Sequence, residues 1–189
     1  MANEKTIVEA LYNNFLLRDL FAKIVPGIIV LESVLYNNPF GDGVVTLAER
    51  IGWAAVLVLA GLAWLVGFAV QEIGEITRVI RHHPQSYDQS DYRYRRRIAF
   101  RGVASESEVQ QVERYAVIKE ATGNSATAIF LTVGIIAVRH LLPSDNFVAS
   151  AVLPGFLLIV LAFALLRANR NHANKQYAFI DSVVDRESS

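Results

Sequence analysis

Cysteine is absent from the 189 residues, and charged side chains are scarce. The missing cysteine excludes disulfide bonds, thiol catalysis and cysteine-ligated zinc or iron–sulfur sites. Only 19% of the residues are charged, below the roughly one quarter that is usual in soluble domains. The sequence also lacks a glycine-rich phosphate loop, a nucleophile elbow and any metal-ligand spacing. We therefore expect no enzyme, no catalytic residue, no metal and no cofactor.

Long apolar runs without charge are prominent instead. Ile51 to Val70 is one such run, and Phe147 to Leu166 is another; each has 20 residues. At about 1.5 Å per residue, such a helix spans about 30 Å, the thickness of the hydrocarbon core of a bilayer. A core helix of a soluble protein would carry a polar stripe, and these runs have none. We therefore predict that both are transmembrane helices.

Two further apolar runs are interrupted. Leu20 to Tyr36 contains Pro26, which removes a backbone donor, so a neighbouring helix must satisfy the freed carbonyl in lipid. Ala126 to Leu142 contains Arg139 and His140. The predicted fold class is an all-α membrane protein, with one domain over 1–189, four transmembrane helices and a cytoplasmic helical layer. The predicted spans are about 20–36, 51–70, 126–142 and 147–166.

Basic residues are distributed unevenly around these spans. All 18 lysines and arginines except Arg50 and Arg139 lie on one predicted side, which comprises the N-terminal segment up to Lys23, the segment 71–125 and the segment 167–189. The positive-inside rule places this side in the cytoplasm. We expect both termini there, cytoplasmic helical extensions over 71–125 and 167–189, and a location in a bacterial inner membrane.

The extensions carry helical signals. After Val70, apolar residues recur at helical spacing, which predicts an amphipathic stalk. Residues 83–104 predict a loop or a short extended piece. Ser105 to Glu108 fits a capping box, and a helix is expected from there to a stop at Gly123-Asn124. Residues 3–19 predict an amphipathic helix, lying on the membrane surface or packed on the rest of the protein.

Spans one and three share a short pattern. Both contain Gly-Ile-Ile, and a short outward loop and a charge-free run follow in each case, which suggests two repeated hairpins. Glu32 and Arg139 lie five residues after the matched glycines. Buried charges in lipid are costly, so we predict either an intramembrane pair between them or separate contacts with the outer headgroups.

Small residues mark predicted helix contacts. Ala63 and Gly67 are spaced i,i+4 on span two, and Ala151 and Gly155 have the same spacing on span four. Such pairs let helix backbones approach closely, within one bundle or between subunits.

Arginines and aromatic residues cluster between spans two and three. The set that we single out is Arg93, Arg95, Arg96, Arg97, Arg101, Tyr92 and Tyr94. Three interpretations remain open: adhesion to anionic lipid, an anion site for a nucleotide, phosphate or nucleic acid, and structural ion pairs with Glu72, Glu75, Glu106 and Glu108.

Two functions of different class fit this architecture. The first is a membrane scaffold or sensor that forms a homo-oligomer and recruits a soluble cytoplasmic protein. The second is an oligomeric ion channel or membrane-disrupting effector, gated by an anionic ligand at the arginine cluster. The thin polar lining of the spans favours the first. A setting in bacterial stress or phage defence would suit either.

Overall fold

The computed structural model describes residues 18–35, 46, 50, 52–81, 83–84, 90–141 and 152–187. These residues form helices and contain no strand, which confirms the predicted all-α class. The elements are η1 (Leu20–Ile24), α2 (Val25–Leu35), α4 (Trp53–Ile76), α5 (Ser90–Val103), α6 (Glu106–Leu141) and α7 (Val152–Glu187). The helix predicted at 3–19 and the two predicted outward loops lie almost entirely outside the described residues.

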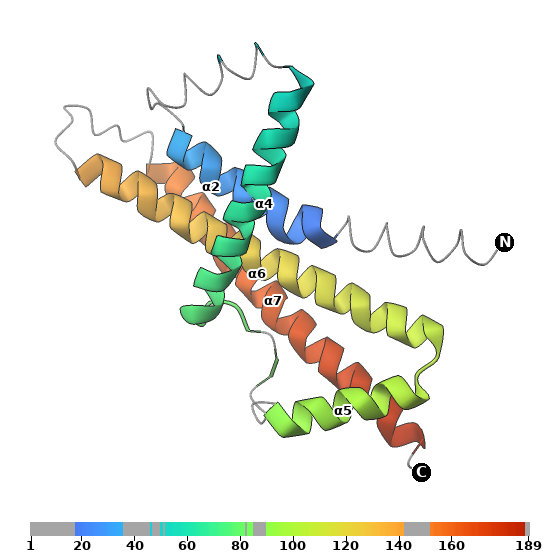
Figure 1. The fold of residues 1–189 in the computed structure, drawn as a ribbon. Helices are drawn as coiled ribbons and strands as arrows, with labels where there is room; N and C mark the ends of the chain where they lie inside the picture. The colour runs from blue at the N-terminus through green and yellow to red at the C-terminus, as the bar shows by residue number, and fades with distance from the viewer. Residues whose placement is uncertain are drawn as a thin grey trace.

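The framework of the molecule is an antiparallel hairpin of α6 and α7 (Figure 1). Each helix has 36 residues, or about 54 Å at 1.5 Å per residue, which is well beyond a hydrocarbon core of about 30 Å. The buried positions of α7 include a seam that alternates steps of four and three: Ala162, Leu166, Asn169, Ala173, Gln176, Ile180 and Val183. This spacing is that of a coiled-coil seam, and α7 presents it to its neighbours in the hairpin and, near its C-terminal end, to α5.

Helix α6 begins at the predicted capping box. Glu108 Oε2 accepts hydrogen bonds of 2.8 Å from the backbone N–H and the hydroxyl of Ser105, and these bonds hold the pKa of Glu108 below its ordinary value. The predicted stop at Gly123-Asn124 is wrong, because α6 continues through both residues to Leu141. A Cβ at Gly123 would lie 2.8 Å from Asn169 Nδ2, so this glycine, in the interior of α6, permits close packing of α6 against α7.

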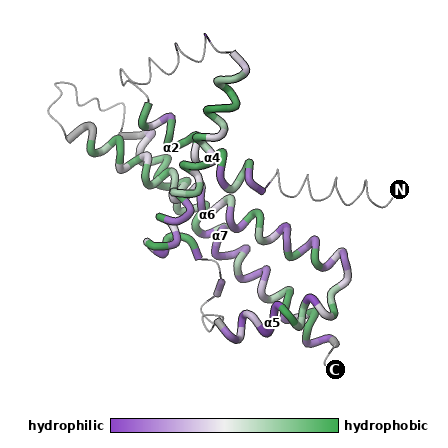
Figure 2. Tube along the Cα trace, in the orientation of Figure 1, coloured by the Kyte–Doolittle hydropathy of each residue, from purple (hydrophilic) through white to green (hydrophobic). Residues whose placement is uncertain are grey.

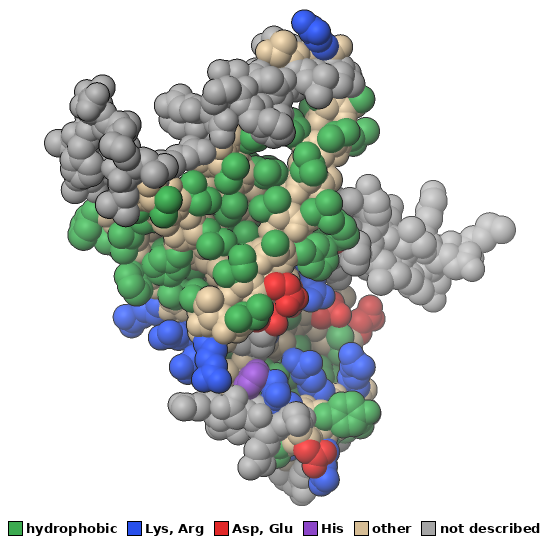
Figure 3. Space-filling view, turned by 60° about the vertical axis from the view of Figure 1, so that its left-hand side comes forward, with side chains coloured by type: hydrophobic (Ala, Val, Ile, Leu, Met, Phe, Trp, Pro, Cys, Tyr) green, Lys and Arg blue, Asp and Glu red, His purple; other side chains and the backbone are tan. Residues whose placement is uncertain are grey.

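Hydrophobic residues concentrate at one end of the molecule (Figure 2). We call this end the apolar half: η1, α2, α4, residues 126–141 of α6 and residues 152–166 of α7. Many of its large side chains are exposed, among them Trp53 at 85%, Leu57 at 74% and Phe163 at 61%. One face of this half is covered by hydrophobic side chains (Figure 3). Exposure on this scale is typical of a surface that contacts lipid or protein.

Two of the described helices, α4 and α6, are long and apolar enough to cross a membrane. The predicted spans 51–70 and 126–142 fall on these two helices. For the other two predicted spans, η1 and α2 together cover only Leu20–Leu35, and the run 147–166 begins outside the described residues.

The segment after α4 differs from the predicted stalk. The helix ends at Ile76, and Arg78 takes a left-handed conformation with φ 58°, which turns the chain back. Ile80 N–H then donates to Gly74 O at 3.0 Å, and the Ile80 side chain is buried. A Cβ at Gly74 would lie 2.4 Å from Ile80 Cδ1, so the missing side chain makes room for the turn.

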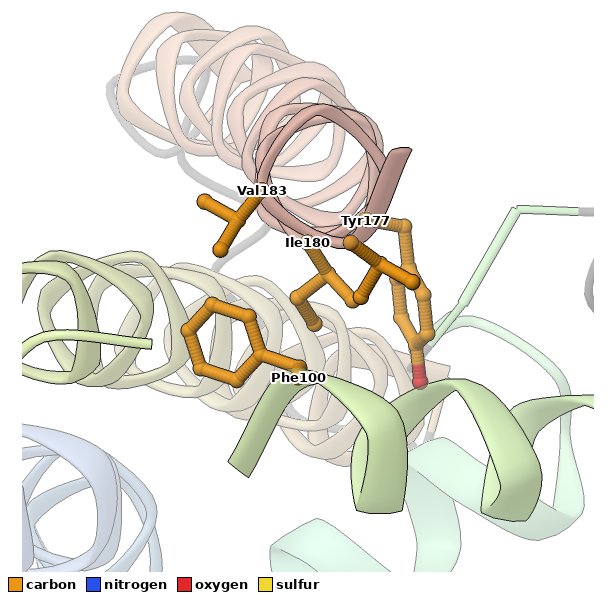
Figure 4. Packing of buried hydrophobic residues seen from close by; sticks show 5 residues of the cluster. Phe100, Tyr177, Ile180 and Val183 are labelled. Atoms are coloured by element: carbon orange, nitrogen blue, oxygen red, sulfur yellow. The ribbon is translucent and has the colours of Figure 1, made fainter. Parts of the chain in front are cut away.

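Helix α5 lies at the end of the molecule opposite the apolar half (Figure 1). The prediction of a loop or a short extended piece over 83–104 is wrong for most of this segment. Instead, Ser90–Val103 forms a helix that packs across α7. Phe100 of α5 points toward Ile180 and Val183 of α7 (Figure 4). We call α5, residues 106–125 of α6 and residues 167–187 of α7 the polar arm. The apolar anchor Phe100 explains the helix, because most helical stability in proteins comes from tertiary packing.

Candidate functional site

The predicted arginine cluster lies on α5, and three of its five arginines point toward the rest of the protein. Arg96 Nε donates to Asp181 at 2.6 Å, and Arg96 Nη2 donates to Asp185 at 2.5 Å. Arg97 Nη2 donates to the hydroxyl of Tyr177 at 3.0 Å, with the guanidinium 5.8 Å from the centre of that ring. These contacts fasten α5 to α7.

The remaining arginines of the cluster are used differently. Arg93 Nη1 donates to His83 Nδ1 at 2.9 Å, which connects α5 to the linker after α4. Arg95 pairs with Asp91 one turn earlier on α5 at 2.8 Å, and both are largely exposed. The described ion pairs of the cluster thus join it to Asp91, Asp181 and Asp185, and of the predicted carboxylates Glu108 pairs with Arg186 of α7.

One face of α5 remains exposed. Tyr94 is 67% exposed and Ile98 is 52% exposed, and Arg101 lies three residues further along on a similar side of the helix. Tyr92 is also exposed, at 45%. This surface combines apolar and cationic groups, a composition that is typical of protein-binding surfaces.

The distance from the apolar half bears on the lipid interpretation of this cluster. Asp181, the partner of Arg96, lies 14 residues beyond Arg167 on α7, or about 21 Å along the helix. A headgroup layer is only about 5 to 8 Å thick, and surface potentials decay within about 10 Å. If the apolar half lies in a membrane, a lipid headgroup at its end would therefore lie well beyond the reach of Arg96.

A buried polar layer lies where the apolar half meets the polar arm; we call it the neck. Asn169 of α7 has no exposed surface, and its Nδ2 donates to the backbone carbonyl of Lys119 on α6 at 2.8 Å. Lys119 Nζ donates to Gln176 Oε1 at 2.9 Å. The Arg81 N–H donates to Asn169 Oδ1 at 3.3 Å. The neck therefore joins α6, α7 and the linker after α4.

Lys119 is the one buried lysine of the described residues, and it is only 3% exposed. Burial lowers its pKa from the ordinary value of 10.5 to about 8, and nearby Arg97 and Arg18 act in the same direction, while Glu120 opposes them. Asn169 and Gln176 occupy otherwise apolar seam positions of α7, and both bond to Lys119 on α6. Matched polar groups at such positions specify the register of paired helices.

The predicted consequence of Pro26 is confirmed. In an α-helix, the N–H of residue 26 would bond to the carbonyl of residue 22, and proline lacks this donor. The chain forms the π-helix η1 immediately before Pro26, and the side-chain amide of Asn124 on α6 donates to the Ala22 carbonyl. Asn124 is 1% exposed, and it does not end α6 but satisfies a backbone carbonyl on a neighbouring helix.

Charges near the start of η1 are paired. Lys23 Nζ lies 3.0 Å from Asp19 Oδ1 and 3.9 Å from the centre of the Phe68 ring. Asp19 also accepts a hydrogen bond of 3.4 Å from Trp64 Nε1. Arg18 forms two hydrogen bonds of 2.8 Å with Glu120 on α6, which raise the pKa of Arg18. The N-terminal side of the first predicted span is thereby attached to both α4 and α6.

Two of the four predicted packing residues lie at a close helix crossing. Ala63 and Gly67 of α4 are buried, and a Cβ built on Gly27 of α2 would lie 1.8 Å from Ala63 O. A Cβ on Gly67 would lie 2.1 Å from Lys23 O. In contrast, a Cβ on Gly155 would meet nothing within 4 Å, and Ala151 lies outside the described residues.

The predicted Glu32–Arg139 pair has one described side chain. Glu32 is exposed on α2, and the side chain of Arg139 lies outside the described residues. The matched glycines of the suggested repeat have different surroundings, since Gly27 packs against Ala63 and a Cβ on Gly134 would meet nothing within 4 Å. The pair and the repeat stay predictions.

The comparisons with known proteins return no relative. The chain matches no protein-family model, no curated protein and no solved structure.

Proposed function

We propose that the chain is an integral membrane protein that crosses the bilayer four times, with both termini on the side of the polar arm. The exposed apolar surface of the apolar half supports this proposal. The lengths of α6 and α7 support it too, because each exceeds a bilayer core by about 24 Å, enough to form the arm. The location in a bacterial inner membrane stays a prediction.

We further propose that the protein is a homo-oligomeric scaffold or sensor that recruits a soluble protein to the exposed face of α5. The observation that carries this proposal is the exposure of Tyr94 and Ile98 on a helix whose opposite face is fixed by Phe100 and Arg96. A rigid helix with exposed aromatic and aliphatic side chains costs little conformational entropy on binding. Arg101 on the same side of α5 would favour an acidic partner.

A pull-down with matched variants tests the scaffold proposal. The tagged protein is purified in a mild detergent and read by native mass spectrometry, alongside Tyr94→Ser/Ile98→Ser. Ile118→Ser on α6 is the control, because Ile118 is 41% exposed on the arm but off α5. We expect a stoichiometric soluble protein that is lost in the α5 variant and retained in the control. Retention in both variants would contradict the proposed surface.

An oligomeric channel is the second candidate. Glu32 favours it, because an ionisable side chain exposed on a helix of the apolar half is costly in lipid and suits the wall of an aqueous pore between subunits. Purified protein in liposomes would then conduct ions, and Glu32→Gln would change the cation-to-anion permeability ratio. Liposomes that remain tight, with protein incorporation verified, would argue against conduction.

A further inference from the structure

Four arginines outside the α5 cluster lie around the neck. Arg78 and Arg81 belong to the linker after α4, and Arg167 and Arg170 belong to α7. All four are exposed. Among the contacts that the structure describes, none of their guanidinium groups forms an ion pair or a hydrogen bond, although Arg93 and Arg96 on α5 are both bonded.

The backbone brings the linker that carries Arg78 and Arg81 into contact with the turn of α7 that carries Arg167 and Arg170. The Arg81 N–H bonds to the side chain of Asn169, which lies between Arg167 and Arg170 in the sequence. Asn169 is fully buried and bonded to α6, so this anchor point is fixed. Arg167 and Arg170 are three residues apart and therefore share a side of α7. The left-handed conformation of Arg78 turns the linker toward this point.

The neck arginines lie at the boundary of the apolar half. Leu166 is the last residue of the charge-free run, and Arg167 follows it directly. Basic side chains border the lower edge of the apolar face (Figure 3). On α4, the nearby carboxylates are Glu72, which is exposed, and Glu75, which accepts a hydrogen bond from Gln71 at 3.0 Å. The guanidinium groups are thus placed at headgroup depth for a chain whose apolar half is in the membrane.

From this placement, we infer that Arg78, Arg81, Arg167 and Arg170 form a binding site for the phosphate headgroup of an anionic phospholipid in the leaflet on the side of the polar arm. The inference rests on the proposed membrane insertion. Guanidinium groups suit phosphate because their planar N–H donors match its oxygens. A basic residue near an anionic membrane surface contributes about fivefold in binding, so two contribute about 25-fold.

Matched double variants test the site. The full chain, in detergent, is titrated with phosphatidylglycerol or phosphatidylcholine, and bound lipid is counted by native mass spectrometry. The variants are Arg78→Gln/Arg81→Gln and Arg167→Gln/Arg170→Gln. The control is Arg95→Gln/Arg101→Gln, which removes the same charge from the exposed side of α5. We expect each neck pair to weaken binding of phosphatidylglycerol about 25-fold, and the control to change it less than twofold.

Three results would overturn the inference. The first is equal binding of phosphatidylglycerol by the neck variants and the unmodified protein. The second is an equal loss in the α5 control, which would indicate a general charge effect. The third is displacement of the lipid by millimolar inorganic phosphate, which would identify a site for free phosphate. Carbonate extraction of membranes, measured separately, reports on the proposed insertion itself, so failure of the lipid site and failure of the membrane proposal are distinguishable.

Discussion

Replacing Lys119 by methionine should remove a pH dependence of stability that this one buried lysine creates. Its folded-state pKa of about 8 lies below the ordinary 10.5, so the unfolded chain binds the proton more tightly. Stability therefore rises with pH between these two values, because protonated Lys119 opposes folding at neutral pH. Methionine has a similar volume and carries no charge, so the stability of the Lys119→Met variant has no contribution from the titration of this side chain.

The magnitude follows from linkage. For a group with pKa values of about 8 folded and 10.5 unfolded, the stability gain between pH 7 and pH 9.5 is about 2 kcal/mol. In a protein of this size, 1 kcal/mol shifts the melting temperature by about 2 to 4 °C, so the gain is about 4 to 8 °C. At pH 7, the lost hydrogen bond to Gln176 offsets part of the benefit of Lys119→Met. The difference in pH slope is therefore the sharper readout.

The assay is thermal unfolding of the detergent-solubilised protein at pH 7.0, 8.0, 9.0 and 9.5. Other groups titrate in this range, so the quantity of interest is the melting temperature of the unmodified protein minus that of Lys119→Met at each pH. Lys175→Met is the matched control, because Lys175 is exposed on α7. We expect the difference to grow in favour of the unmodified protein by about 4 to 8 °C for Lys119. A difference that stays the same across the pH range would contradict the conclusion that burial lowers the pKa of Lys119.

Three further substitutions test the contacts that organise the fold. Gly27→Ala should destabilise the protein by about 1 to 3 kcal/mol or more, because its Cβ would overlap a carbonyl of α4, whereas Gly61→Ala, which meets nothing within 4 Å in the interior of α4, should retain or raise stability in the same thermal assay. Asn124→Ala should cost about 1 to 3 kcal/mol, because it leaves the Ala22 carbonyl unpaired, and full stability of this variant in a thermal melt would contradict the assignment. Arg96→Gln should cost about 1 kcal/mol and speed trypsin cleavage within α5, since it removes the ion pairs of α5 with Asp181 and Asp185; an unchanged cleavage rate would mean that Phe100 and Arg97 hold the helix without these ion pairs.

The sequence predicts the helical class well because apolar runs report directly on the environment of a helix. Most of the run at 51–70 lies in α4, and most of the run at 126–142 lies in α6. The Ser105–Glu108 signal also located a helix start, because a capping box depends only on neighbouring residues. Such features are local, and local features can be read from one sequence.

The errors arose where a distant contact decides the local structure. Gly123-Asn124 resembles a helix stop, but Asn169 and Ala22 provide contacts that keep α6 helical. The sequence of 83–104 is typical of a loop, but the packing of Phe100 against α7 stabilises a helix over Ser90–Val103.

The buried polar layer of the neck is not predicted from the sequence either. Its polar residues do leave a signal, since Asn169 and Gln176 continue the four-three alternation of apolar residues on α7. The acidic partners of Arg96, Asp181 and Asp185, left no comparable signal, because they lie 85 and 89 residues further along the chain.

Thiol accessibility tests the proposed topology most directly, and a chain without cysteine gives it no background. Single cysteines are introduced at Ser144, in the predicted outward loop, and at Ser182, exposed on the polar arm. Intact cells are treated with a membrane-impermeant maleimide, before and after permeabilisation. The account predicts that Ser144→Cys is labelled in intact cells and that Ser182→Cys is labelled only after permeabilisation. Labelling of both positions from one side would contradict a membrane-crossing hairpin of α6 and α7.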